Sequence, residues 1–257
     1  ELLASRRDSC EADRALFFSP DLDLQAINQK IDEALRKLPA LYVARPFREP
    51  FHTIVAAPAP PSSYSLLGID GSQIVPSRHQ AVPFGLINVG WIGVDHGSGR
   101  VPWTGKRSHI IPFAAMFNHY GSLISDTEVD LQRDLAERTL IPQLFAGESQ
   151  GLRIALSDGS LEVHRSREDM HAAPRIEEQL ASLEMLFAQK QILHAGYIDK
   201  PGSAMLSRML AIGQLKDINP ESVSAAMRSL PTTDLELFQE HLKRPGERSA
   251  VFEIISK

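Results

Sequence analysis

Three apolar stretches in the first half of the chain have the lengths and flanking residues of β-strands. They are residues 65–70, 84–94 and 109–115. The longest is followed by residues 95–99 (Asp-His-Gly-Ser-Gly), whose composition is typical of a turn. We therefore expect a run of antiparallel hairpins in this part of the chain.

Segments with helical spacing of apolar residues lie on either side of these strands. Residues 20–38, 126–141 and 176–194 are predicted helices, and the last has an apolar stripe formed by Ile176, Leu180, Leu183, Phe187 and His194. Pro142 is expected to end or kink the second helix, because proline has no backbone N–H to donate.

Two further strands are predicted in the second half of the chain. Residues 152–157 form a compact apolar run, and residues 194–198 form a short one. Further on, Asn219-Pro220 and the threonines before Asp234 are typical helix starts. Strands followed by helix, strand, helix and strand predict an α/β fold, with a mixed sheet flanked by helices and additional helical segments.

A segment rich in proline and alanine, residues 45–63, is expected to be a linker or an extended lead-in. It divides the chain into an N-terminal helical segment and linker, residues 1–63, and a domain that comprises residues 64–257. The chain opens on Glu1 and stops soon after the apolar residues 251–255, so we expect it to be a fragment or part of a longer protein.

Composition narrows the class of protein. The hydrophobic fraction of 43% and the charged fraction of 23% are ordinary for a globular protein, and the net charge of −5 excludes a basic nucleic-acid coat but not a local basic groove. The single cysteine, Cys10, excludes an internal disulfide and a cysteine-cluster zinc site. No apolar run is long enough to span a bilayer and no signal peptide is visible, so the expected location is cytoplasmic, without a membrane partner.

Two Asp-Gly-Ser triplets, beginning at Asp70 and Asp158, follow apolar strand candidates. Ligands collect at the carboxyl ends of strands in open α/β sheets, so we expect both carboxylates at one edge of the sheet. Manganese and magnesium prefer oxygen ligands, and two such ions can activate a water and stabilise the leaving oxygen of a phosphodiester. The triplets therefore favour a hard metal site, whereas one triplet alone is explained by turn capping.

A third carboxylate is needed to complete such a site. Glu137 is the best candidate, because it shares a helix face with Ile141 and Leu144 and is expected to point inward. Glu128 and Asp134 lie close enough in the sequence to compete for the same role. A solvated position for Glu137 remains the alternative.

Several short blocks, taken in order, resemble the NurA nuclease family. They are residues 68–73, residues 86–90, Arg133 to Glu137, residues 156–161, residues 195–203 and the Pro-Gly-Glu-Arg-Ser sequence at 245–249 with Phe252. Each block alone is a weak signal, whereas their ordered succession from about residue 64 to 253 is fairly specific.

The resemblance implies an RNase H-like fold and a manganese-dependent DNA nuclease, with magnesium as the alternative ion. It implies exonuclease and single-strand endonuclease activity in DNA end resection and repair, with Asp70, Glu137 and Asp158 as metal-binding catalytic residues. It also implies a homodimer that works with a hexameric HerA-type ATPase translocase. The family completes its site with a C-terminal tyrosine and histidine, and this chain stops before that block, so we expect its C-terminal part to be incomplete.

Basic residues supply candidate DNA contacts. Lys106 and Arg107 flank Trp103 in a predicted loop, and basic residues beside an aromatic ring suit single-strand binding. Lys200 follows a predicted strand within one of the resembling blocks. A solvated loop is the favoured alternative for Lys106 and Arg107, and a surface position explains Lys200 equally well. Tyr197 is expected in the core.

Two other classes of function remain open. A phosphoryl-transfer enzyme of the haloacid-dehalogenase type needs Asp-x-Asp-Gly-Thr, but Gly68 stands where its nucleophilic aspartate would be. A catalytically incomplete nuclease-like scaffold or regulatory subunit would explain the missing C-terminal block. No paired histidine and acid motif supports a serine hydrolase, and no HxH or HExxH arrangement supports zinc catalysis.

Overall fold

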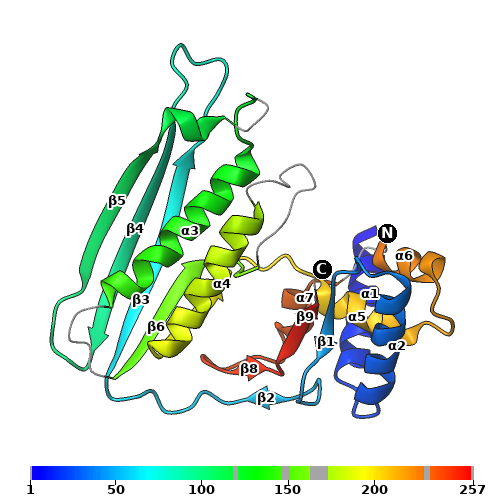
Figure 1. The fold of residues 1–257 in the computed structure, drawn as a ribbon. Coiled ribbons are helices and arrows are strands. Elements are labelled where there is room, and N and C mark those ends of the chain that lie inside the picture. The colour runs from blue at the N-terminus through cyan, green and yellow to red at the C-terminus, as the bar shows by residue number, and fades with distance from the viewer. Residues whose placement is uncertain (1, 118–120, 146–150, 163–172, 229–231, 256–257) are drawn as a thin grey trace. The chain divides into compact units, whose positions relative to one another are not determined.

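The computed structural model divides the chain into two compact units, residues 60–199 and residues 1–59 with 200–257 (Figure 1). The structure describes residues 2–117, 121–145, 151–162, 173–228 and 232–255. The chain first passes from one unit to the other between residues 59 and 60, near the predicted boundary at residue 63. The chain returns to the unit of residues 1–59 at residue 200, and the sequence did not predict this return. Residues 200–257 pack with the N-terminal segment rather than with the sheet.

A five-stranded mixed sheet forms the centre of the unit at residues 60–199. Strands β3 (Tyr64–Ile74), β4 (Gly85–His96) and β5 (Trp103–Ile111) are antiparallel neighbours. Strands β6 (Leu152–Asp158) and β7 (Ile192–Tyr197) run parallel to β3. The strand order is β5-β4-β3-β6-β7, so β3 lies in the middle with an antiparallel partner on one side and a parallel partner on the other.

Helices α3 (Asp126–Leu144) and α4 (Ala173–Gln189) lie on one face of this sheet (Figure 1). The Ser125 hydroxyl caps α3 by accepting a hydrogen bond from the Glu128 amide at 3.1 Å. The core fills the space between the helices and the sheet, where alternate strand residues point toward the helices. Its fully or almost fully buried members from β3, β4 and the helices include Leu67, Ile69, Ile87, Val89, Ile141 and Phe187.

The other face of the sheet carries no helix from the described part of this unit (Figure 1). The strand register places five exposed large apolar or aromatic side chains on it, next to exposed polar ones such as Asp70 and Lys106: Ile74, Ile92, Ile110, Leu193 and Tyr197. Tyr197 is 58% exposed, so the prediction that it belongs to the core is wrong. It points away from the helices because it is in register with Asp158 on this face.

The predicted strand at 109–115 is misplaced. The strand begins earlier, at Trp103, and the chain turns into a short 3-10 helix, η1 (Phe113–Met116), after Pro112. The predicted loop around Lys106 and Arg107 is therefore part of β5, because pairing with β4 orders these polar residues. Their sequence alone has no apolar alternation that predicts a strand.

Three local predictions about element ends also change. Strand β3 continues four residues past Asp70, because β4 pairs with it as far as Ile74. Helix α3 continues two residues past Pro142, and the Phe145 amide bonds the Ile141 carbonyl at 3.2 Å. The helix predicted to reach residue 194 ends earlier, at Gln189, and His194, which was also predicted to begin the strand at 194–198, lies in β7.

The second unit contains five helices among the described residues. These are α1 (Leu2–Phe17), α2 (Leu24–Lys37), α5 (Met205–Gln214), α6 (Pro220–Arg228) and α7 (Asp234–Phe238). The start of α7 is confirmed, and Thr233 forms a reciprocal capping box with Glu236. No helix among the described residues combines the length and the hydropathy needed to cross a bilayer.

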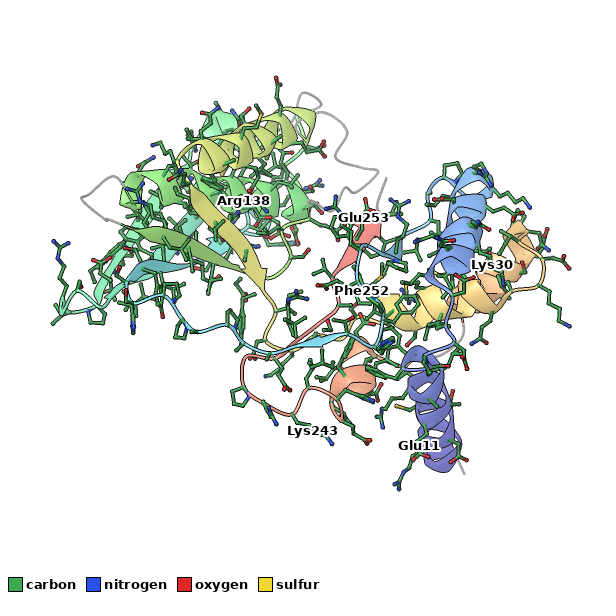
Figure 2. All side chains as sticks on the ribbon, turned by 90° about the horizontal axis from the view of Figure 1, so that it is seen from below. Glu11, Lys30, Arg138, Lys243, Phe252 and Glu253 are labelled. Carbon is green, nitrogen blue, oxygen red and sulfur yellow. The ribbon has the colours of Figure 1, made fainter. Side chains whose placement is uncertain are left out.

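Two short antiparallel strand pairs connect the start and the end of this unit. Strand β1 (Val43–Pro46) pairs with β9 (Phe252–Ile255), and β2 (Ile54–Val55) pairs with β8 (Arg248–Ser249). Phe252 and Glu253 are labelled on β9 in Figure 2, and Arg45 pairs with the Glu253 carboxylate across the β1–β9 ladder. The buried Phe17 ring packs against a group of aromatic rings, Phe18, Phe51, Phe238 and Phe252.

Two tryptophans make reciprocal contacts between β4 and β5. The Trp103 ring covers Gly93, and the Trp91 ring covers Gly105, so an added Cβ would lie 2.0 Å and 2.3 Å from the respective rings. We expect Gly93→Ala to displace Trp103 and to lower the free energy of unfolding by about 1–3 kcal/mol. Chemical denaturation followed by fluorescence measures this directly, because these are the two tryptophans of the chain.

Gly90→Ala is the matched control on the same strand. An added Cβ there would meet its nearest atom, the Asp70 carbonyl oxygen, only at 3.9 Å. It should unfold at the wild-type denaturant concentration or slightly above it. Equal destabilisation by the two substitutions would contradict the reciprocal packing.

Candidate active site

Asp70 and Asp158 line one pocket on the helix-free face of the sheet. The pocket has a volume of about 550 Å³, and its other lining residues are Gly68, Ile69, Gly90, Trp91, Ile92, Leu156, Ser157 and Tyr197. Both aspartates are exposed, and neither carboxylate forms a hydrogen bond or an ion pair with another described residue. The structure thus brings together the two carboxylates that the Asp-Gly-Ser triplets single out.

The register of β3 and β6 explains why these carboxylates meet. The parallel pairing ends at Ile69 and Ser157, and each aspartate is the next residue of its strand. Neighbouring residues in register point to the same face of a sheet, so both side chains project away from the helices. Gly68 and Gly90 contribute no side chains to the floor of this pocket, which leaves the backbone accessible between Asp70 and β4.

Glu137 lies on the helix-covered side of the sheet. It is 6% exposed, and a Cβ added to Gly71 would lie 2.4 Å from its Oε1 atom, so Gly71 leaves the space that the carboxylate fills. Because Gly71 and Asp70 are adjacent in β3, they point to opposite faces. The expectation that Glu137 points inward is confirmed, and its role as a metal ligand stays a prediction.

The pKa of Glu137 is raised to about 7. Burial is the main cause, and the negative charges of Asp134 and Asp70 add to it, whereas Arg133 and Arg138 act in the opposite direction. The Arg133 Nε atom lies 3.4 Å from Glu137 Oε1. Glu137 is therefore about half protonated near neutral pH.

Arg133 connects α3 to β3 beside this carboxylate. One of its terminal nitrogens donates to Gln73 Oε1 at 2.8 Å, and the other donates to Asp134 at 3.2 Å. Asp134, a competing ligand candidate, is thus engaged by Arg133. Glu128, the other competitor, lies in the first turn of α3.

Within the described residues, no group of three histidine, cysteine, aspartate or glutamate side chains is arranged to hold a metal ion. The pair of Asp70 and Asp158 nevertheless suits a hard divalent cation, because its carboxylate oxygens have no competing partner in the described structure. Magnesium and similar ions are often bound by only one or two carboxylates, and water and substrate phosphate supply the remaining ligands. The residues present therefore fit such an ion as a two-carboxylate site.

The predicted DNA-contacting residues fall in different places. Lys106 is in register with Gly90, which is itself paired with Asp70, so Lys106 lies on the pocket face. Arg107 points to the helix-covered face, where it donates to Gln143 at 3.2 Å. Lys200 begins the second chain segment of the other compact unit.

The sequence did not predict a partly buried polar cluster next to Asp158. Ser157 Oγ and His194 Nε2 lie 2.9 Å apart, and His194 Nδ1 lies 2.8 Å from Glu184 Oε1. Arg138 also contacts Glu184, at 3.4 Å. The signal available in the sequence was a serine at an inward position of an apolar strand. His194 stood at the overlap of a predicted helix and a predicted strand, which left its partner unidentified.

A family model described as the NurA domain matches residues 64–257. Among solved structures, the NurA nuclease from Sulfolobus solfataricus is 13% identical over 78% of this chain and 63% of that chain, with a TM-score of 0.33. A structure of NurA with manganese is 14% identical over 66% of this chain, with a TM-score of 0.26. This chain covers only 42% of that protein's length. A search of curated proteins gave no match.

A third solved structure, LC9-RNase H1, is 12% identical over 69% of this chain and 77% of that chain, with a TM-score of 0.26. Likeness at this level does not transfer the roles of individual residues. The predicted resemblance to the NurA family is confirmed by the family model. The predicted mixed α/β sheet flanked by helices is also confirmed.

The raised pKa of Glu137 predicts a pH-dependent stability. The folded chain holds this proton up to about pH 7, against an ordinary pKa of 4.5, so stability from this group is lost as pH rises from 4.5 to 7. Glu137→Gln stays neutral, and we expect it to be about 1–3 kcal/mol more stable than the wild type at pH 8. At pH 5 the two should be nearly equal.

Urea denaturation at the two pH values, without divalent metal, measures this difference. Glu178→Gln on the exposed side of α4 is the control, and its stability should follow the wild type at both values. A constant difference between Glu137→Gln and the wild type across the range would contradict the assignment.

Proposed function

The chain belongs to the NurA domain family of nucleases, and from this premise we propose that it is a metal-dependent deoxyribonuclease. The observation that carries the proposal is the pair of Asp70 and Asp158, two unpartnered carboxylates in one pocket of the described structure. Manganese is the proposed ion, with magnesium as the alternative. Exonuclease and single-strand endonuclease activity in DNA end resection are the proposed reactions.

In this mechanism, Asp70 and Asp158 would hold the metal ion from neighbouring strands. When bound, such an ion activates a water molecule and stabilises the leaving oxygen of the phosphodiester. Glu137, which is close enough to Asp70 for their charges to interact, is proposed as the third acidic group. Its role requires the ionised form, so a nearby cation would favour the loss of its proton.

The pocket also offers groups that suit a nucleic-acid strand. Gly68 and Gly90 leave the sheet surface free of side chains, and the exposed ring of Tyr197 lies at one side. Lys106 lies on the same face, beyond Gly90, where its ammonium group can neutralise a backbone phosphate. Lys200 is a further proposed phosphate contact.

The remaining partners follow from family membership alone. We propose that a second copy of the chain and a hexameric HerA-type ATPase translocase act together with the nuclease. Light scattering of the isolated chain, and its co-elution with such an ATPase, test these two associations independently of cleavage.

Asp70→Asn and Asp158→Asn are expected to lower manganese-dependent cleavage by roughly 100-fold or more, because a ligand of the ion is worth several kcal/mol in the transition state. Degradation of end-labelled single- and double-stranded DNA, with manganese, magnesium or EDTA, measures the effect. The control is Asp95→Asn. Asp95 lies near the C-terminal end of β4, outside the pocket, and the asparagine retains a side-chain oxygen that can accept the hydrogen bond from Ser65. Cleavage that survives in both pocket variants would refute the site.

The two basic residues of β5 should differ in their effect on DNA binding. Lys106→Gln is expected to weaken binding and to reduce the slope of log affinity against log salt concentration by about 1, whereas Arg107→Gln should change neither. Fluorescence anisotropy with a labelled single-stranded oligonucleotide, in EDTA to prevent cleavage, measures both quantities. Equal effects of the two substitutions would contradict the assignment of Lys106 to the binding face.

A further inference from the structure

Four side chains form a continuous polar network on the helix-covered side of the sheet. Ser157 of β6 contacts His194 of β7, His194 contacts Glu184 of α4, and Glu184 contacts Arg138 of α3. Arg138 is labelled in Figure 2. The network therefore links two parallel strands to both covering helices.

The chemistry of each group determines the direction of these hydrogen bonds. An ionised Glu184 can only accept, so it receives one hydrogen bond from His194 Nδ1 and one from Arg138. Burial lowers the pKa of His194, although Glu184 acts in the opposite direction, and the neutral ring then has an acceptor at Nε2. The Ser157 hydroxyl donates to that nitrogen.

This order of serine, histidine and carboxylate also occurs in serine hydrolases, but the placement differs. Ser157 is 5% exposed, and it points away from the pocket face because it alternates with Asp158 along β6. Arg138 is also 5% exposed. The His194 side chain is buried as well, whereas Glu184 is 41% exposed at the edge of the network. Breaking the contacts of the three buried groups is costly, because it leaves each of them without a partner.

The network contacts the chain just before Asp158 and in the turn that follows it. Ser157 immediately precedes this aspartate, and the Leu161 carbonyl, three residues after it, accepts a hydrogen bond from Arg138 at 3.0 Å. Within the turn, the Gly159 amide donates to the Tyr197 carbonyl at 2.8 Å, and Gly159 adopts a left-handed φ of 82°. The chain is thus held on both sides of Asp158.

The same network reaches the helix that carries Glu137. Arg138 is the next residue along α3, and it connects this helix to the turn after β6. The Asp158 carboxylate has no hydrogen-bond partner among the described residues, so its position depends on the backbone on either side. A metal ligand has to be held to within roughly 0.5 Å of its productive position.

We propose that Ser157, His194, Glu184 and Arg138 are positioning residues. They hold Asp158 in place for metal binding and fix its position relative to helix α3. This inference rests on the proposed function for the role of Asp158. It assigns to the network a contribution to metal affinity that is separate from its contribution to stability.

The test compares Ser157→Ala and His194→Phe with the wild-type full-length chain. Both substitutions break the contact between β6 and β7, and Ser157→Thr keeps the hydroxyl. Leu180→Ala is the control, because it removes a buried side chain from α4 in a separate cluster around Leu131 and Ile176. Three quantities are measured: manganese affinity from the electron paramagnetic resonance signal of free ion, kcat and KM for DNA, and amide exchange at Gly159 in the metal-free protein.

We expect Ser157→Ala and His194→Phe to weaken manganese binding by about tenfold and to lower kcat by a similar factor, with KM for DNA changed less than twofold. In the metal-free protein, exchange at Gly159 should accelerate relative to amides in β4. Ser157→Thr should bind manganese within about twofold of the wild type. Leu180→Ala should lose stability while its manganese affinity and its relative Gly159 exchange stay unchanged.

Wild-type manganese affinity and unchanged relative exchange at Gly159 in both network variants would overturn the inference, whatever their stability. A wild-type chain that neither binds manganese nor cleaves DNA would instead overturn the proposed function. In that case, unchanged relative exchange at Gly159 in the two network variants would also show that the network does not hold the turn. Accelerated exchange would show that the network stabilises the turn but has no role in metal binding.

Discussion

The parallel pairing of β3 with β6 is the constraint on which the arrangement of the candidate site depends. Residues Tyr64 to Ile69 pair with Leu152 to Ser157, and the pairing stops one residue before Asp70 and Asp158. A shift of one residue in either strand would turn one aspartate toward the helices, because side chains alternate along a strand. The buried residues Leu67, Ile69 and Ala155 resist such a shift, since it would expose them.

This alternation also separates two kinds of chemistry on the two faces of one sheet. The pocket face carries exposed carboxylates, glycines and Tyr197, whereas the helix-covered face holds buried charges that are all close to opposite charges or hydrogen-bond partners. Glu137 lies beside Arg133, and Arg138 contacts Glu184. Buried charges need such partners, because removing them from water is costly. The covered face therefore supports the exposed one through the strands that they share.

Much of the fold was predictable from local patterns. The apolar runs that became β3, β4 and β6, and the caps that start α3 and α7, depend on residues close together in the sequence. The errors arise where tertiary contacts outweigh local preference. Strand β3 continues past its Asp-Gly-Ser triplet because β4 pairs with it, and the polar residues around Lys106 join the sheet for the same reason.

For the site, the sequence by itself determined the chemistry that is available: two Asp-Gly-Ser triplets, an inward glutamate on α3 and the family to which these blocks belong. Only the tertiary structure decided which of these groups meet. Asp70 and Asp158 share a pocket, whereas Glu137 lies across the sheet beside Gly71. Only the fold brought His194 to Ser157 and Glu184. The physical reason is that strand pairing and helix packing join residues far apart in the chain, and local periodicity contains no information about those distances.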